Sequence, residues 1–139
     1  MKKLILCLIL FISANALETK KINYKNSNKV KFEILDDSKQ KNEKINKYYK
    51  NGKLEYTEQF RNGMRDGLKV YYYENGNAKY KVPFINGKVR GYIKAYHKNG
   101  KLKFTSSLFD NKYDGYTKTY LDNGKVNKTH HYKDGKLLK

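Results

Sequence analysis

The sequence predicts an all-β protein, an elongated single-layer antiparallel β-meander built from tandem 24-residue hairpin repeats. Three observations lead to this prediction. An Asn-Gly dipeptide recurs at this period without insertion or deletion, a second turn signal recurs about midway between, and a single glycine follows each of the first three second turns. Asn-Gly favours a hairpin because both central residues of a type I′ turn need a positive φ, which glycine adopts freely and asparagine tolerates.

The turn signals form two series. The first is Asn51-Gly52, Asn75-Gly76, Asn99-Gly100 and Asn123-Gly124, and the second is Asn62-Gly63, Asn86-Gly87, Asp110-Asn111 and Asp134-Gly135. The expected structural turn residues are Gly52, Gly63, Gly76, Gly87, Gly100, Gly124 and Gly135. The single glycines are Gly67, Gly91 and Gly115. They either leave room for a neighbouring aromatic ring on an apolar face or mark a bulge in each second strand.

Residues 1–16 are typical of a signal peptide. Two lysines form a charged start, Leu4–Ile12 is an apolar run, and Ala14-Asn15-Ala16 is a small-residue cleavage site. A membrane-anchoring helix is the alternative, but the run is shorter than the roughly 20 residues that span a bilayer. We therefore expect cleavage near Ala16 and export to a periplasm, an outer surface or the medium. The only cysteine, Cys7, would be removed with this segment.

Residues 17–46 are predicted to form a degenerate capping hairpin and a polar connection. A shift by one repeat places Tyr24 under Tyr48, Ser27-Asn28 under the first turn, Val30 under Leu54 and Phe32 under Tyr56. The polar, charged segment from Asp36 to Lys47 indicates either a flexible connection or a short surface helix.

Residues 47–139 are predicted to form a repeat domain of about four repeats. Strand side chains alternate between faces and a two-residue turn pairs the residues beside it, so parity assigns each residue to a face. The predicted apolar face carries Leu54, Tyr56, Phe60, Tyr71, Tyr73, Ala78, Tyr80, Val82, Phe84, Val89, Ile93, Ala95, Leu102, Phe104, Leu108, Tyr113, Leu121, Val126 and Tyr132. The chain ends in a short lysine-bearing strand, which discourages edge-to-edge aggregation.

The opposite face is predicted to be basic and aromatic. Its candidate partner-binding residues are Tyr48, Tyr72, Tyr96, Tyr120, Lys79, Lys81, Lys94, Lys103 and Lys118. Aromatic faces beside cations suit sugars, lipid head groups, stacked bases or a protein interface. Cross-strand aromatic neighbours also stabilise a sheet by roughly 0.2 to 1 kcal/mol each, so a purely structural role for the tyrosines stays open.

The charge balance is strongly basic. The net charge is +18, and loss of residues 1–16, which contain two lysines and no acid, leaves +16. Such a field attracts polyanions without specifying one, although the lysines could equally serve solubility. Without cysteine, the mature chain can form neither disulfides nor thiolate metal sites.

No catalytic, cofactor or metal site is predicted. His130 and His131 are adjacent on a strand and point to opposite faces, while His97 is expected to pack on the apolar face. Ser106 and Ser107 match no nucleophile motif, and the glycines lie at turns and not in a phosphate-binding loop. A repeat protein of this kind is expected to present a binding or scaffolding surface and not to be an enzyme.

From about Lys47 to the C-terminus the chain resembles MORN repeats. The residues that carry the resemblance are Tyr-Tyr-Glu-Asn-Gly at 72–76, Ile-Asn-Gly-Lys-Val-Arg-Gly-Tyr at 85–92 and Tyr-His-Lys-Asn-Gly-Lys-Leu at 96–102. The chain is more closely similar to the bacterial variant repeat, grouped with YwqK-type antitoxin proteins. The chain departs from the family pattern at two places, Asn111-Lys112 in the second turn and Lys128 at an otherwise aromatic position. Both departures are expected to affect the packing of the last unit.

The resemblance implies a surface that binds proteins or acidic phospholipids. We expect an exported protein that contacts another protein through the basic face, or through an open strand edge by strand addition. The alternatives are electrostatic binding to an acidic phospholipid, lipopolysaccharide or polysaccharide surface, and an antitoxin-like component whose toxin would have to meet it outside the cytoplasm. Nucleic acid is not expected as a partner, and the partner's identity and the oligomeric state stay open.

Overall fold

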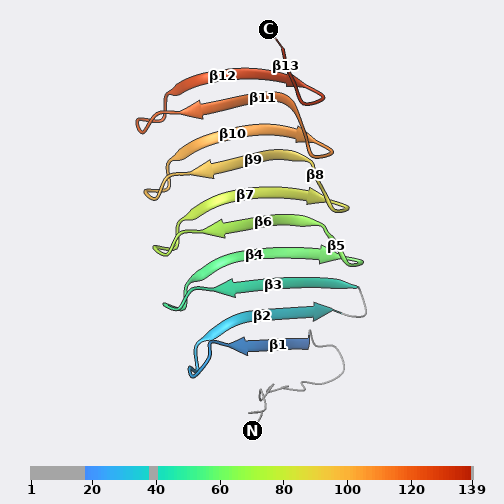
Figure 1. The fold of residues 1–139 in the computed structure, drawn as a ribbon, viewed down its shortest axis with the longest axis vertical. Helices are drawn as coiled ribbons and strands as arrows, with labels where there is room; N and C mark the ends of the chain where they lie inside the picture. The colour runs from blue at the N-terminus through green and yellow to red at the C-terminus, as the bar shows by residue number, and fades with distance from the viewer. Residues whose placement is uncertain (1–17, 38–40, 139) are drawn as a thin grey trace.

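The computed structural model describes residues 18–37 and 41–138, which form one open antiparallel sheet of 13 strands. The long strands follow one another in chain order, and each of two very short strands pairs only with the strand before it (Figure 1). The predicted all-β, single-layer meander is confirmed. The described residues contain no helix able to cross a membrane. The predicted signal peptide lies outside the described residues.

Most strands cross the whole sheet, whereas three short strands lie next to the second turns. The strands are β1 (Glu18–Asn23), β2 (Val30–Asp37), β3 (Asn42–Tyr48), β4 (Leu54–Arg61), β5 (Met64–Arg65), β6 (Gly67–Tyr72), β7 (Ala78–Ile85), β8 (Lys88–Val89), β9 (Gly91–Tyr96), β10 (Leu102–Phe109), β11 (Lys112–Tyr120), β12 (Val126–Lys133) and β13 (Lys136–Leu138). The first turns line the left edge of the sheet in Figure 1, and the second turns line the right edge.

The second turns have the predicted type I′ geometry. Both central residues have positive φ, as at Asn86 (49°) and Gly87 (78°). Asp110 and Asn111 adopt the same conformation, with φ of 50° and 69°. Asparagine therefore replaces glycine at position 111 without loss of the turn.

The first turns are hairpins of a different type. The N–H of Gly76 donates to the carbonyl of Tyr73, and the N–H of Tyr73 donates to the carbonyl of Asn77, both at 2.8 Å. Gly76 has a φ of 95°, whereas Asn75 is not among the residues with positive φ. This is a type I turn followed by a left-handed glycine, so the type I′ prediction is wrong for this series. The Asn75 side chain instead accepts the N–H of Asn77 at 3.0 Å.

These first turns shift the register just inside each hairpin. Tyr71 pairs with Tyr80, but Tyr72 pairs with Ala78, which leaves Lys79 as an extra residue. The other repeats show the same irregularity. As a correction to the parity assignment, four residues predicted on the apolar face lie on the opposite face, beside the column of tyrosines: Leu54, Ala78, Leu102 and Val126.

The single glycines mark a second series of bulges, one of the two predicted alternatives. Gly91 has a φ of 109°, and the N–H of the preceding Arg90 donates to the carbonyl of Pro83 at 3.3 Å. A Cβ on Gly91 would meet Pro83 Cγ at 3.3 Å, and one on Gly115 would meet Ser107 Cβ at 3.0 Å. The nearby side chains thus come from the basic face, and they are not the aromatic rings of the other prediction.

The N-terminal region departs from two predictions. The N–H of Tyr24 donates to the carbonyl of Lys29. The β1–β2 loop is therefore one residue longer than the others, and Tyr24 corresponds to Tyr49 instead of Tyr48. Residues 42–48 form β3, which pairs with β2 over residues 42–47 and with β4 over its whole length. The flexible connection or surface helix predicted for Asp36–Lys47 is therefore wrong in the part that is described. Ladders on both sides hold this polar segment as a strand.

A single layer leaves little room for a sealed core. Among the described apolar residues only Val70, Ala95 and Leu108 are 9% exposed or less. The predicted apolar face carries an aromatic ladder, with ring centroids of Tyr71 5.7 Å from Tyr56 and 6.3 Å from Tyr80. Contrary to the prediction it also holds a buried carboxylate, Glu58, at 2.9 Å from Lys69 Nζ and 3.1 Å from Arg65 Nε. Cross-strand pairs, rather than a central core, hold the sheet together.

Tyrosine hydroxyls connect successive repeats at the first-turn edge, and we call these contacts the tyrosine staples. Their hydrogen bonds run from Tyr24 to the Tyr48 carbonyl (2.7 Å), from Tyr49 to the Tyr72 carbonyl (2.7 Å) and from Tyr73 to the Tyr96 carbonyl (2.8 Å). In the next repeat His97 takes this position, with Nε2 3.3 Å from Asp122 Oδ1. The last repeat has Leu121 there, which has no group to donate.

Candidate functional site

The basic face is organised by a row of residues that crosses the sheet perpendicular to its strands. The register places one residue of each long strand in this row, which we call the central row. It consists of Lys21, Glu33, Asn46, Thr57, Val70, Lys81, Lys94, Thr105, Lys118 and Thr129. Neighbours in the row lie about 4.7–4.9 Å apart, the spacing of strands in a sheet.

The N-terminal half of the central row is electrically compensated. Glu33 accepts hydrogen bonds from Asn46 Nδ2 at 3.2 Å and from the Tyr48 hydroxyl at 2.9 Å, and its other oxygen lies 3.4 Å from Lys21 Nζ. Burial raises the pKa of Glu33, but the hydrogen bonds from Tyr48, Asn46 and Lys21 outweigh it and hold this pKa below its ordinary value. Tyr48, a predicted partner-binding residue, is thereby engaged within the protein.

The C-terminal half of the row contains three lysines with no acidic partner. Lys81 and Lys94 lie directly opposite each other on β7 and β9. Within residues 18–37 and 41–138, no ion pair joins Lys81, Lys94 or Lys118 to a carboxylate. Lys81 Nζ lies 5.5 Å from the Tyr96 ring centroid, and Lys118 Nζ 5.9 Å from that of Tyr116. Like charges directly opposite one another destabilise a sheet, so the fold alone does not favour this arrangement.

A shallow trough lies over β10 in this half of the row. On one side β9 carries Tyr92, Lys94 and Tyr96 at alternate positions, and on the other β11 carries the same pattern. The hollow between them measures about 390 Å³ and is lined by Tyr92, Lys94, Leu102, Thr105, Tyr116, Lys118 and Tyr120. The Tyr120 hydroxyl lies 3.4 Å from Thr105 Oγ1. Two aromatic walls, each with a lysine at its centre, thus flank a narrow strip over β10.

The structure brings together only some of the predicted partner-binding residues. Lys94, Lys118 and Tyr120 line the trough, while Lys81 and Tyr96 lie next to it. Tyr72 is on the same face, where it pairs with Ala78.

Lys79 and Lys103, both predicted on the basic face, are the extra residues of two first-turn bulges, and the Lys79 side chain does not follow the predicted face. The Lys79 ammonium lies 5.6 Å from the Tyr73 ring centroid and 5.5 Å from that of Tyr80, and Tyr80 belongs to the apolar face. Lys103 is the extra residue at the equivalent bulge between Leu102 and Phe104. A bulge places two consecutive side chains opposite one residue, which interrupts the alternation that parity assumes.

Sequence reasoning missed several exposed residues of the basic face. Tyr92 and Tyr116 line the trough and are 59% and 53% exposed. Leu68, Ile85 and Phe109 follow the parity of the basic face and are 42%, 47% and 56% exposed. The pattern Gly-Tyr-x-Lys-x-Tyr, present at 91–96 and 115–120, is the signal that could have identified the two tyrosines.

His130 and His131 point to opposite faces of the sheet, as predicted, whereas His97 lies at the first-turn edge beside Asp122. His131 pairs with Tyr116 on the basic face, where the two rings stack at 4.4 Å with an interplanar angle of 17°. His130 pairs with Thr117, which lies on the other face beside Ser106. Among the described residues no group of three His, Cys, Asp or Glu side chains could hold a metal ion. His131 stacks against Tyr116 and so supports one wall of the trough.

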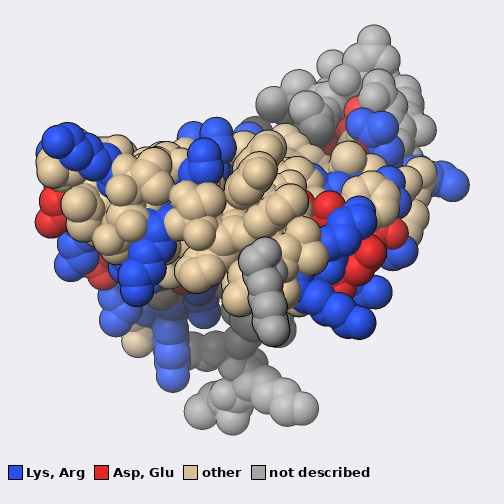
Figure 2. All heavy atoms as spheres, turned by 90° about the horizontal axis from the view of Figure 1, so that it is seen from above, with Lys and Arg blue, Asp and Glu red and all other residues tan. Residues whose placement is uncertain are grey.

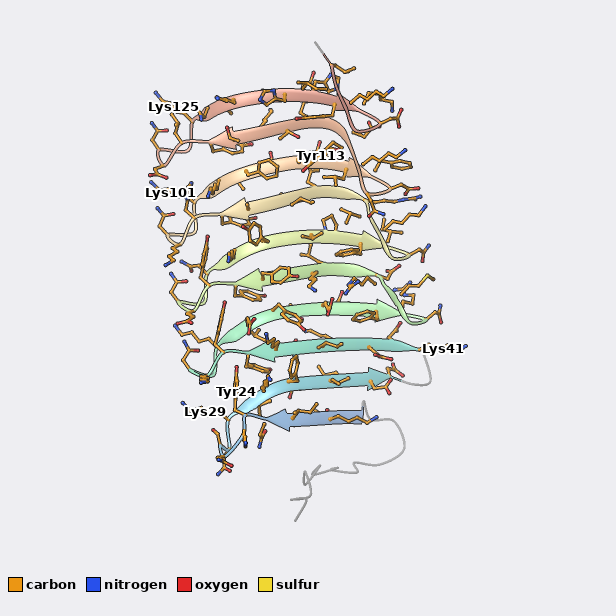
Figure 3. The ribbon with its side chains drawn as sticks, viewed as in Figure 1. Tyr24, Lys29, Lys41, Lys101, Tyr113 and Lys125 are labelled. Carbon is orange, nitrogen blue, oxygen red and sulfur yellow. The ribbon has the colours of Figure 1, made fainter. Side chains whose placement is uncertain are left out.

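Many of the remaining charges lie at the turn edges. Lys and Arg side chains gather at both edges in the view from above (Figure 2). Figure 3 shows Lys29, Lys101 and Lys125 at the first-turn edge and Lys41 at the opposite edge. Several second-turn cations are compensated, since Asp110 pairs with Arg90 and Lys88. Hydrogen bonds from these two cations lower the pKa of Asp110.

Comparison with known proteins agrees with this repeat architecture. The sequence profile of the MORN repeat variant matches residues 45–62, 65–86, 87–111 and 113–134. The chain therefore belongs to the MORN repeat variant family, whose repeats are generally found in binding or scaffold modules. The match does not single out the YwqK-type group. A comparison with curated proteins found no match.

Two solved structures are similar to this chain. One is a mutant of S. aureus TarM in complex with fondaparinux, alpha-GlcNAc-glycerol and UDP, at 14% identity and a TM-score of 0.50 over 78% of this chain. The other is a crystal structure of TarM, at 13% identity and a TM-score of 0.49 over 77% of this chain. The present chain spans only 21% and 20% of those chains, so the likeness concerns the sheet and not the whole protein.

Proposed function

We propose that this chain is an exported, non-enzymatic interaction module that binds another protein through the basic face. One observation carries the proposal: over the strands from β6 to β11, exposed apolar and tyrosine side chains lie beside Lys81, Lys94 and Lys118, which form no ion pair with an acid in the described part of the chain. Interface centres are rich in tyrosine, and exposed apolar patches on soluble proteins mark interaction sites.

The composition of the face favours a protein partner over a purely anionic surface. Electrostatic adhesion needs only cations, and it gains nothing from exposed Leu68, Ile85 or Phe109. Protein side chains can cover such groups and at the same time supply carboxylates to the lysines. The net charge of +18 supports electrostatic binding to an anionic surface as the second candidate function.

A salt titration separates the two candidates. The tagged full chain would be used to retain proteins from the envelope and culture fractions of its own cells, with ionic strength raised to about 1 M, where the Debye length is about 3 Å. Retention of a defined partner at high salt supports a packed protein interface. Binding to anionic vesicles or polysaccharide that disappears at high salt, with no retained protein, supports the second candidate.

Matched variants then test the face itself. Tyr92→Ser with Tyr116→Ser removes two exposed rings of the basic face, and Lys79→Gln with Lys103→Gln changes the bulge positions. The partner should be lost with the first pair and kept with the second. Equal recovery with both pairs would rule out the basic face. Fractionation of the cells tests export, which would be excluded by a full-length chain found only in the cytoplasm.

A further inference from the structure

The trough over β10 has a specific chemistry that the rest of the basic face lacks. We infer that it binds an extended segment of a partner protein, with one Glu or Asp side chain held between Lys94 and Lys118 and an apolar side chain on either side. This inference rests on the proposed function and names the kind of partner segment. It requires neither a metal ion nor any chemical step.

The position of the acidic side chain follows from the central row. Lys94 on β9 and Lys118 on β11 flank Thr105 on β10. Two strand spacings separate the backbones of the lysines by about 10 Å. A carboxylate placed over Thr105 is within reach of both flexible ammonium groups, and each would donate a charge-assisted hydrogen bond.

The apolar positions follow from the rows on either side. Toward the second turns the walls of the trough are Tyr92 and Tyr116, and toward the first turns the trough is lined by Leu102 and Tyr120. These rows lie about two residues of strand from the central row, or roughly 7 Å. An extended segment running along β10 repeats at the same spacing, so its residues two before and two after the acid meet these rows. The expected pattern is apolar-x-acidic-x-apolar.

The wall on β11 is held in place before any ligand binds. The Tyr116 ring stacks on His131, and the Tyr120 hydroxyl lies within reach of Thr105. Pre-ordered aromatic side chains lose little conformational entropy on binding, which favours recognition of a short segment. The two lysines are left to bind an external anion, because the nearby acids Asp110 and Asp114 are already paired with other cations.

A protein segment fits this chemistry better than a polyanion such as a sulfated glycan or RNA. Leu102 lies in the trough, and Phe109 extends from β10 beyond Ser107 with 56% of its surface exposed. Aliphatic and aromatic side chains of a peptide can cover these groups. A chain of phosphates or sulfates would instead place further negative charges over the apolar rows. The lysines that line the trough, Lys94 and Lys118, lie in the central row and not in these rows.

The test uses the full chain and a fluorescent nonapeptide with Leu-Ser-Glu-Ser-Leu at its centre. Its side-chain order is the same in both directions, so the orientation of the segment does not affect the result. Fluorescence anisotropy should show saturable binding, about tenfold weaker when Gln replaces the central Glu, because two charge-assisted hydrogen bonds are lost. Equal affinity of the Glu and Gln peptides would overturn the inference.

Two matched double variants localise the effect. Lys94→Gln with Lys118→Gln should remove the preference for Glu, whereas Lys79→Gln with Lys103→Gln loses the same charge at the bulges and should keep it. Circular dichroism and thermal unfolding would confirm that both variants are folded. If the two variants weaken binding equally, overall charge is responsible and the site is refuted. Binding of polyphosphate or polyuridylate through Lys94 and Lys118, without peptide binding, would also refute it.

Failure of this inference can be told apart from failure of the proposed function. If the partner protein is lost with Tyr92→Ser and Tyr116→Ser but kept with Lys94→Gln and Lys118→Gln, the basic face is an interface without an acidic anchor. The inference then fails and the proposed function stands. If both pairs keep the partner, both are wrong.

Discussion

The two ends of the central row use the same strand register for opposite electrostatic purposes. At the N-terminal end Glu33 is surrounded by Lys21, Asn46 and Tyr48, which satisfy its charge and hydrogen bonds. At the C-terminal end Lys94 and Lys118 flank Thr105 and no described acid pairs with them. The sheet therefore accommodates both a compensated acid and uncompensated lysines in this row, so the uncompensated lysines are not a requirement of the fold.

The two ends also differ in their backbone. The ladders among β2, β3 and β4 are regular across the whole width of β3, apart from the shift at the first turn. Farther along the sheet, each of the first three second turns is instead followed by a strand with a glycine bulge, at Gly67, Gly91 and Gly115. If the N-terminal end acts in stability and the C-terminal end in binding, matched substitutions at the two ends should change the free energy of unfolding differently.

The largest expected change in stability comes from altering the backbone of the C-terminal end. Gly115→Ala should lower the free energy of unfolding by about 2–3 kcal/mol, because alanine strains a φ of 103° and its Cβ meets Ser107 at 3.0 Å. Glu43→Ala, at the equivalent position of β3, should change it by less than about 0.5 kcal/mol. Urea denaturation measures both. Equal changes would show that the bulge carries no special constraint.

Removal of the compensated acid should have the next largest effect. Glu33→Ala leaves the Tyr48 hydroxyl and Asn46 Nδ2 without their acceptor, which should cost about 1–2 kcal/mol. The exposed Glu74→Ala serves as the control and should stay within about 0.5 kcal/mol. A Glu33→Ala protein as stable as the parent would mean that this end is not a stabilising cluster.

The same acid predicts a pH dependence with a definite sign. Because the pKa of Glu33 is held below its ordinary value of 4.5, its contribution is fully present above that value. It is lost as the pH falls through the lowered value of the folded state. The difference in unfolding free energy between the parent and Glu33→Ala should therefore shrink below about pH 4. A difference that is constant from neutral to acidic pH would contradict the assignment.

The smallest expected effect concerns the paired lysines. Lys94→Thr relieves the repulsion from Lys81 and should raise stability by a few tenths of a kcal/mol, more at low salt than at high salt. Lys21→Thr, which breaks the contact with Glu33, should have the opposite sign. Thermal unfolding at two ionic strengths measures the pair. A loss of stability in Lys94→Thr would make this lysine structural.

The fold could be predicted from the sequence more completely than the binding site could. Period and turn residues were enough to predict the meander, including the type I′ turns such as Asn86-Gly87. The type I′ turn predicted at Asn75-Gly76 was wrong, because a type I turn followed by a left-handed glycine favours the same dipeptide. β3 could not be predicted from its polar composition, because neighbouring strands and not its own residues determine its conformation.

The site depended on a detail that local patterns do not reveal. First-turn bulges at Lys79 and Lys103 interrupt the alternation, so parity counted from the turn misplaced Lys79 and Leu102. Parity counted within β9 and β11, away from the turns, would have grouped Tyr92 with Lys94 and Tyr116 with Lys118. The hollow itself comes from the small Thr105 side chain between two larger walls, which emerges only once three strands are in register.

The tyrosine staples have a consequence for the order in which the molecule opens. Hydroxyl-to-carbonyl bonds join the repeats from Tyr24 to Tyr96, then give way to the His97–Asp122 contact and end at Leu121. In β12 every residue except Tyr132 is exposed. Since each repeat touches only its neighbours, amide hydrogen exchange should be fastest in the C-terminal hairpin and slow progressively toward β4 and β6. Local unfolding would thus start beside the trough and leave the compensated end intact.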